Sequence, residues 1–177
     1  QYYGAGKIKE TKQVIFTSLV FLSVIAIIMS ISGYFLTDYL LELVKTPANI
    51  IDMAGTYLRI YFLGLIFIFL YNTLASIFQA LGDSRTPLYF LIFSTAMNIL
   101  LDYIFVVYFK LGVAGVAWAT VIAQAFAAVL CFIYSWKYVP MLRFSSAELV
   151  FFFFFFSQIS HYGVPVCVEQ MIFSLEV

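Results

Sequence analysis

The chain has 177 residues, of which 64% are hydrophobic, 20% are aromatic and 10% are charged. A soluble domain is about 45–50% apolar and about 25% charged, so this composition, with a mean hydropathy of +1.04, excludes a soluble globular protein and a disordered chain. Nine basic and nine acidic residues cancel. No basic surface is therefore expected to attract nucleic acid.

Four apolar runs are long enough to cross a bilayer, whose hydrocarbon core of about 30 Å takes roughly 20 residues of helix. The runs at 14–36, 60–81 and 111–136 contain no charged residue, and the run at 88–109 contains one, Asp102. A helix of this length at the surface of a soluble protein would carry a polar face. We therefore predict an all-α, polytopic transmembrane helix bundle, with the lipid bilayer as its surroundings.

Loop charge predicts the orientation of the bundle, because loops rich in lysine and arginine stay in the cytoplasm. The segments before the first run, between the second and third, and after the fourth carry six basic residues: Lys7, Lys9, Lys12, Arg85, Lys137 and Arg143. The segments on the opposite side carry three: Lys45, Arg59 and Lys110. We expect the first set to face the cytoplasm.

Asp102 is the residue with the strongest functional implication. It lies fourteen residues after Leu88 in an apolar run, where a carboxylate costs about 2.5–3.5 kcal/mol on insertion scales. Asn98 precedes it by four residues and shares its helical face. One interpretation is a polar contact that locks the bundle. The interpretation that we favour is a proton or cation site, because burial disfavours the charged carboxylate and its oxygens suit a small cation.

Polar and small residues also recur on the second and fourth runs. Tyr57, Tyr61 and Asn72 belong to a polar and aromatic stripe, which suits either helix packing or a cavity for a flat, amphipathic ligand. In the fourth run, small residues recur every fourth position from Gly115 to Ala127, a spacing typical of close helix packing. Thr120 and Gln124 lie one position beyond this stripe, and we expect them to face the same space as Asp102.

Enzymatic and metal chemistry find little support in the sequence. The chain has one histidine and two widely separated cysteines, Cys131 and Cys167, so neither a disulfide framework nor a metal-ligand spacing is present. No nucleophile and base can be paired. We expect a protein that is not an enzyme and has no cofactor.

Six sequence strings occur in an order that resembles the multidrug and toxic compound extrusion (MATE) transporters. They are QYYGAGKIKETK, TYLRIYFLG, QALGDSRTP, NILLDYIFV, LGVAGVAWATVIAQ and GVPVCVEQ. The resemblance implies a two-lobe fold of twelve helices, of which this chain would supply an incomplete part. Residues 1–143 would be helices three to six of the N-lobe, 144–162 an inter-lobe linker and 163–177 the start of the first C-lobe helix.

The resemblance also implies a function. Members of this family export cationic amphipathic drugs or toxins in antiport with protons or sodium, as multi-pass proteins of the plasma membrane, which in bacteria is the inner membrane. Ion coupling would fall to Asp102, Asn98 and Thr120, and these three would also be the ligands of a sodium ion. The substrate cavity would include Tyr57 and Asn72, and the expected polar lining adds Tyr61 and Gln124. The partners would be the bilayer, the substrates and the remaining helices of the transporter.

Two other functions fit a helical membrane bundle. A lipid-linked oligosaccharide flippase would share the architecture but would need arginines or lysines in its cavity to bind pyrophosphate, and the four apolar runs contain none. A non-transporting structural membrane subunit would not need a carboxylate at mid-span. Both remain alternatives to the exporter.

Overall fold

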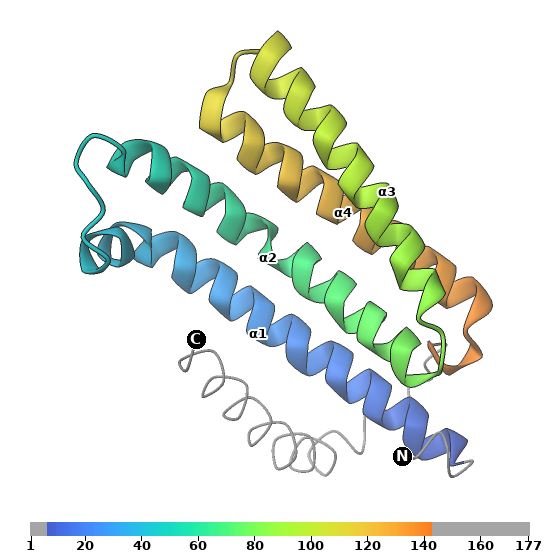
Figure 1. The fold of residues 1–177 in the computed structure, drawn as a ribbon. Helices are drawn as coiled ribbons and strands as arrows, with labels where there is room; N and C mark the ends of the chain where they lie inside the picture. The colour runs from blue at the N-terminus through green and yellow to red at the C-terminus, as the bar shows by residue number, and fades with distance from the viewer. Residues whose placement is uncertain (1–6, 143–177) are drawn as a thin grey trace, which may run out of the picture. The chain divides into compact units, whose positions relative to one another are not determined.

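The computed structural model describes residues 7–142. Its elements, in chain order, are α1 (Ile8–Leu43), α2 (Ile51–Ala80), α3 (Arg85–Asp102), the π-helix η1 (Tyr103–Tyr108), α4 (Gly112–Tyr138) and the 3-10 turn η2 (Pro140–Leu142) (Figure 1). Within these residues the structure contains helices and connecting turns and no strand.

The prediction of an all-α polytopic bundle is confirmed. Between residues 7 and 142, four helical segments are long and apolar enough to cross a membrane: Ile8–Leu43, Ile51–Ala80, Arg85–Tyr108 and Gly112–Tyr138. Each predicted run lies on one of these segments, with at most one residue of overhang. The helices α1 and α2 extend beyond their apolar runs, so the connection between them shortens to residues 44–50. The expected linker at 144–162 and the segment 163–177 lie outside the described residues.

The chain divides into two compact units, and α1 passes from one into the other. The first unit comprises Gln1–Phe21 and Val139–Val177. Within its described residues, Thr11, Ile15 and Thr17 are buried, and so is Leu142 in η2. The second unit, Leu22–Tyr138, contains every candidate site residue of the sequence analysis.

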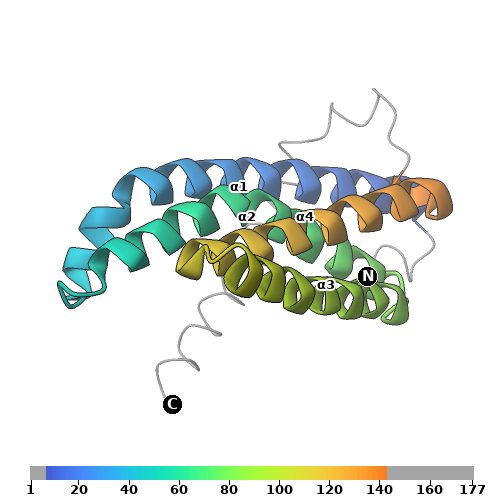
Figure 2. The same cartoon turned by 90° about the horizontal axis from the view of Figure 1, so that it is seen from above.

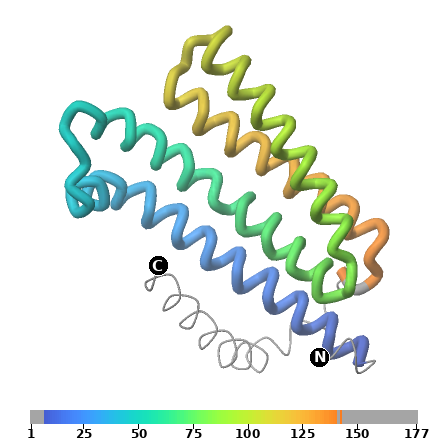
Figure 3. Tube along the Cα trace, in the orientation of Figure 1, coloured from blue at the N-terminus to red at the C-terminus, as the bar shows by residue number. Residues whose placement is uncertain are grey.

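In the second unit, α4 packs against both α2 and α3, and the part of α1 in this unit lies beside α2 (Figures 2 and 3). The contact of α1 with α2 is close at Gly33, where an added Cβ atom would collide with the Phe62 ring. It also includes an ion pair, in which Nη2 of Arg59 lies 2.6 Å from Oδ1 of Asp38. The candidate site residues lie on α3 and α4, which pack against each other.

The contact of α2 with α4 forms a small apolar core. Ile60 of α2 packs with Ala117 and Val121 of α4, and all three are buried. At Gly64 the two backbones approach so closely that an added Cβ would lie 3.0 Å from Cγ1 of Val121 and closer still to Cγ2. The small-residue stripe of α4 is also buried, from Gly115 through Ala119 and Ala123 to Ala127. Small side chains therefore let α4 approach its neighbours, as the spacing predicted.

Little of α3 is covered by the rest of the second unit. Among its residues Pro87 and Ser94 are buried, whereas the large apolar side chains Leu88, Tyr89 and Ile92 are each more than half exposed. In a membrane such a surface faces lipid or further helices.

Candidate functional site: a partly buried carboxylate at the end of α3

The turn between α2 and α3 fixes where α3 begins. Gly82 has φ +90°, a conformation that ends a helix and favours glycine. The Asp83 carboxylate then caps α3, because its Oδ1 accepts hydrogen bonds from the backbone N–H groups of Arg85 and Thr86, each at 3.0 Å. Tyr71 of α2 donates its hydroxyl proton to the Pro87 carbonyl at 2.7 Å. Together these bonds fix the first turn of α3 against α2.

These hydrogen bonds also act on the Asp83 carboxyl group, which is partly exposed in the turn. The hydroxyl and backbone N–H of Thr86 donate to the ionised form and hold the pKa of Asp83 below its ordinary value. The cap is therefore strongest when Asp83 is ionised.

At mid-span, Asn98 of α3 meets Thr120 of α4. Nδ2 of Asn98 donates to Oγ1 of Thr120 at 3.4 Å, and the Thr120 hydroxyl donates to the Val116 carbonyl one turn earlier, at 3.1 Å. The structure thus joins two of the three residues expected to act in ion coupling, and it joins them across the α3–α4 contact.

The third of these residues, Asp102, is partly buried at the C-terminal end of α3. Its Oδ1 is fully enclosed and has no hydrogen-bond partner among the described residues. The side chain therefore does not extend fully into lipid. An enclosed carboxylate oxygen without a donor is a costly arrangement.

The chain changes its helical geometry directly after Asp102. Residues Tyr103–Tyr108 form the π-helix η1, in which the Phe109 N–H donates to the Ile104 carbonyl at 3.0 Å. The sequence analysis expected one uninterrupted helix here. π-Helical turns occur mostly as single turns and often at functional sites. The turn to α4 follows at once, with positive φ at Lys110 and Gly112, and it makes α3 and α4 an antiparallel hairpin.

The residues expected to line a substrate cavity are not gathered in one place. Tyr57 packs against the core formed by Ile60, Ala117 and Val121, and its ring stacks on Tyr61 with centroids 6.1 Å apart. Asn72 is exposed on α2 and Gln124 is partly buried on α4. Among the described residues, neither amide is hydrogen-bonded to Asp102, Asn98 or Thr120. A role in substrate binding stays a prediction for all four side chains.

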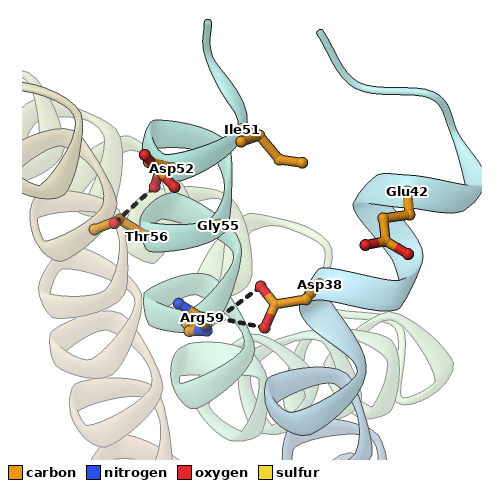
Figure 4. A pocket seen from close by; sticks show the side chains of 7 residues that line it. All are labelled: Asp38, Glu42, Ile51, Asp52, Gly55, Thr56 and Arg59. Atoms are coloured by element: carbon orange, nitrogen blue, oxygen red, sulfur yellow. Dashed lines mark hydrogen bonds and ion pairs between the residues drawn. The ribbon is translucent and has the colours of Figure 1, made fainter. Parts of the chain in front are cut away.

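A pocket of about 370 Å³ opens where α1 ends and α2 begins, and the sequence analysis did not identify it (Figure 4). It is lined by Asp38, Glu42, Ile51, Asp52, Gly55, Thr56 and Arg59. Arg59 holds Asp38, with Nη2 at 2.6 and 2.7 Å from the two carboxylate oxygens. The helix extensions on either side of the 44–50 connection create this pocket, and apolar run lengths gave no signal for them.

Metal coordination by clustered side chains finds no support in the part of the chain that is described. Between residues 7 and 142, no three histidine, cysteine, aspartate or glutamate side chains come together. A cation at Asp102 would instead take amide, hydroxyl or backbone oxygens beside the single carboxylate.

The fold and site define a polytopic helical membrane protein with a carboxylate enclosed near mid-span. Comparison with known proteins identifies the family: the MatE family model matches residues 1–104. The chain therefore belongs to the MatE family, as its resemblance to MATE transporters implied.

Two relatives come from Bacillus subtilis strain 168. The chain is 39% identical over 142 residues to "Probable multidrug resistance protein YpnP", which covers 79% of this chain and 32% of that protein. It is 34% identical over 148 residues to "Probable multidrug resistance protein YoeA", covering 81% of this chain and 32% of that protein. The chain thus spans about a third of the length of these relatives.

A solved structure of an outward-facing multidrug resistance MATE family transporter of the MOP superfamily has the same fold. It superposes with a TM-score of 0.79 at 21% sequence identity and covers 98% of this chain, which corresponds to 39% of that structure. Its likeness supports the helical arrangement described above.

Proposed function

We propose that this chain is the N-lobe portion of a secondary active transporter that exports cationic amphipathic drugs or toxins in antiport with protons or sodium. Membership of the MatE family supports transport, and relatives with multidrug resistance names support the substrate class. The proposed location is the plasma membrane, with residues 7–12 and the turn at 82–84 in the cytoplasm.

The observation that carries this proposal is the enclosed Oδ1 of Asp102. It has no donor among the described residues, and it lies one helical turn from the Asn98–Thr120 hydrogen bond. A carboxylate in this setting is destabilised by burial when it is ionised. Binding of a proton or a cation therefore has a large local effect on this part of the bundle.

The proposed cycle couples that local effect to the position of the substrate. With Asp102 ionised, the transporter binds the cationic drug from the cytoplasm or the inner leaflet. A proton or sodium ion from outside then neutralises Asp102 and brings it into hydrogen bonding with Asn98 and Thr120. The packing of α3 against α4 responds, the N-lobe cavity contracts and the drug leaves outward. The two lobes are the bistable element on which ion and drug act with different affinities.

The test is efflux of a fluorescent cationic dye by the complete two-lobe transporter in proteoliposomes, with proton and sodium gradients imposed separately. We expect Asp102→Asn to abolish gradient-driven efflux, because the neutral amide can neither take up a proton nor balance the charge of a sodium ion. Asp83→Asn is the matched control at a carboxylate outside the spans and should keep gradient-driven efflux. Unchanged efflux and unchanged pH dependence in Asp102→Asn would show that the coupling role is wrong.

A further inference from the structure

The close contact between α4 and η1 depends on Gly115. This glycine is buried in the first turns of α4. A Cβ atom added to it would lie 3.0 Å from the Phe105 Cβ, 3.1 Å from the Leu111 Cβ and 3.3 Å from the Phe105 carbonyl carbon. One of these neighbours is backbone, so it cannot rotate away as a side-chain tip can. An alanine at 115 would therefore displace η1 or Leu111 by a few tenths of an ångström.

This contact and the Asn98–Thr120 hydrogen bond lie on either side of Asp102. Asn98 precedes Asp102 by four residues and Phe105 follows it by three, so each contact is about one helical turn away. In the antiparallel hairpin, Thr120 and Gly115 are the corresponding positions on α4. Along the chain, Asp102 thus lies between two contacts with α4, one made by Asn98 of α3 and one made by Phe105 of η1.

The π-helix connects Phe105 to Asp102 on one side and to the hairpin turn on the other. The Phe105 carbonyl accepts a hydrogen bond from the Leu111 N–H at 2.9 Å, and the Ile104 carbonyl accepts one from Phe109 at 3.0 Å. These bonds tie η1 to the hairpin turn on its far side. A displacement of Phe105 by α4 would therefore be taken up at the start of η1, which is the residue directly after Asp102.

We propose that Gly115 is a positioning residue for Asp102: it lets η1 pack closely on α4, so that Asp102 stays one helical turn beyond Asn98 with its Oδ1 enclosed. This inference rests on the proposed ion-coupling function. Gly115 itself contacts neither ion nor drug in this role, and it acts through Phe105 and η1.

Few other ionisable groups lie on the elements that surround this position. On α2 the charged residues are Asp52 and Arg59, in its first third, and on α4 the charged residue is Lys137, in its last turn. Tyr103 and Tyr108 of η1 are 65% and 79% exposed. Lys110 in the hairpin turn is the charged residue nearest to position 115 in the chain. A change in the proton dependence of transport on substitution at 115 is therefore assigned to Asp102 when Asp102→Asn removes it.

The experiment compares Gly115→Ala with Gly55→Ala in the complete transporter, with dye efflux measured against external proton and sodium concentration. Gly55 is a buried helical glycine of α2, where an added Cβ meets nothing closer than 3.6 Å. We expect Gly115→Ala to shift the half-maximal ion concentration by about threefold or more, with unchanged dye affinity. Gly55→Ala should leave both values unchanged. A purely structural role would lower the amount of protein without shifting this profile.

A second pair of variants decides the question if Gly115→Ala does not insert. Phe105→Ala keeps the Cβ atom that Gly115 contacts, and Phe105→Gly removes it. We expect the ion profile to shift in the glycine variant relative to the alanine variant, and equal profiles would overturn the proposal.

Asp102→Asn distinguishes failure of the proposed function from failure of the positioning role. If it leaves coupling intact, the proposed function fails. If it abolishes coupling while Gly115→Ala and Phe105→Gly keep the wild-type profile, only the positioning role fails.

Discussion

At the scale of single residues, the arrangement around Asp102 combines a costly burial with incomplete hydrogen bonding. Its enclosed Oδ1 has no partner among the described residues. Asn98 donates a hydrogen bond to Thr120, and Thr120 donates one to the Val116 carbonyl. A purely structural carboxylate would be expected to accept such donors, because an unsatisfied buried oxygen costs about 1–3 kcal/mol. The proposed ion-coupling role of Asp102 accounts for this oxygen, because the arriving ion would become its partner.

Substitution of Thr120 is predicted to have a small effect on ion coupling. Thr120→Val keeps the shape of the side chain and removes the acceptor for Asn98, whereas Thr120→Ser keeps it. Interhelical hydrogen bonds in membranes average about 0.6 kcal/mol, so we expect Thr120→Val to shift the half-maximal ion concentration for efflux about threefold. Thr120→Ser should match the wild type. A loss of efflux as complete as that of Asp102→Asn would contradict this ranking and make Thr120 an essential ligand.

Asp83 gives a pH prediction with a defined sign. Because hydrogen bonds from Thr86 and Arg85 lower its pKa, the stabilisation by this cap is complete above the ordinary carboxyl range. It is lost as the pH falls through the lowered pKa. We expect the melting temperature of the detergent-solubilised transporter to fall in acid more steeply for the wild type than for Asp83→Asn. Parallel melting curves from neutral pH to about pH 3 would show that the charge of this cap contributes nothing.

At the scale of secondary-structure elements, α4 is the helix on which the second unit is assembled. It contacts α2 and α3, and its small residues permit both approaches. The contact at Gly64 and the contact at Gly115 place a backbone of one element against an atom of another. In a bilayer, where burial of apolar surface does not drive helix association, such close packing supplies much of the attraction.

Gly64 tests this packing. We expect Gly64→Ala to destabilise the contact of α2 with α4 by about 1–3 kcal/mol, the usual cost of overpacking, because its Cβ would overlap Val121. Adding Val121→Ala should restore most of the loss, since that substitution removes the methyl groups concerned. The measurement is the denaturation midpoint in detergent, with Gly55→Ala as the control. Additive effects of the two substitutions, without rescue, would rule out this contact as the cause.

At the scale of the whole molecule, the chain exposes more apolar surface than a free-standing protein tolerates. Phe35 of α1 is 76% exposed, and α3 leaves nearly all of its apolar side chains uncovered. Patches of this extent mark surfaces for lipid or for other protein segments. This agrees with a chain that spans about a third of its relatives, and we expect it to need a bilayer and the remaining helices to be stable.

The proposed orientation is tested by labelling single cysteines with a membrane-impermeant reagent in intact cells, in a transporter freed of its native cysteines. We expect Asn49→Cys, between α1 and α2, to react from outside. Ser84→Cys, between α2 and α3, should react only after the cells are opened, because Arg85 and the N-terminal lysines favour the cytoplasm. Both positions are exposed. The reverse pattern would invert the assignment of the two faces.

The sequence predicted the helices better than their ends. Each apolar run falls on a helix because a spanning segment must satisfy its backbone hydrogen bonds internally. The apolar runs stop short of the helix ends because Lys9, Glu10 and Asp38 continue α1 without adding to hydropathy. The π-helix at Tyr103–Tyr108 was also missed, since six apolar residues suit an α-helical turn equally well. In the candidate site, the sequence indicated that Asn98 and Thr120 face the same space, because a short connection joins their helices. The structure shows a hydrogen bond between them.

Sequence alone determined that this protein folds in a bilayer and that residues 7–142 contain four spans. It also showed that one span carries a carboxylate, Asp102, which is costly to expose to lipid. These properties follow from hydrophobicity and helix length, which act locally. Tertiary structure decided that Oδ1 of Asp102 is enclosed without a donor, that Gly64 meets Val121 and that Gly115 meets η1. These facts depend on the depth and rotation at which two helices pack, and that geometry is set by atoms far apart in the chain.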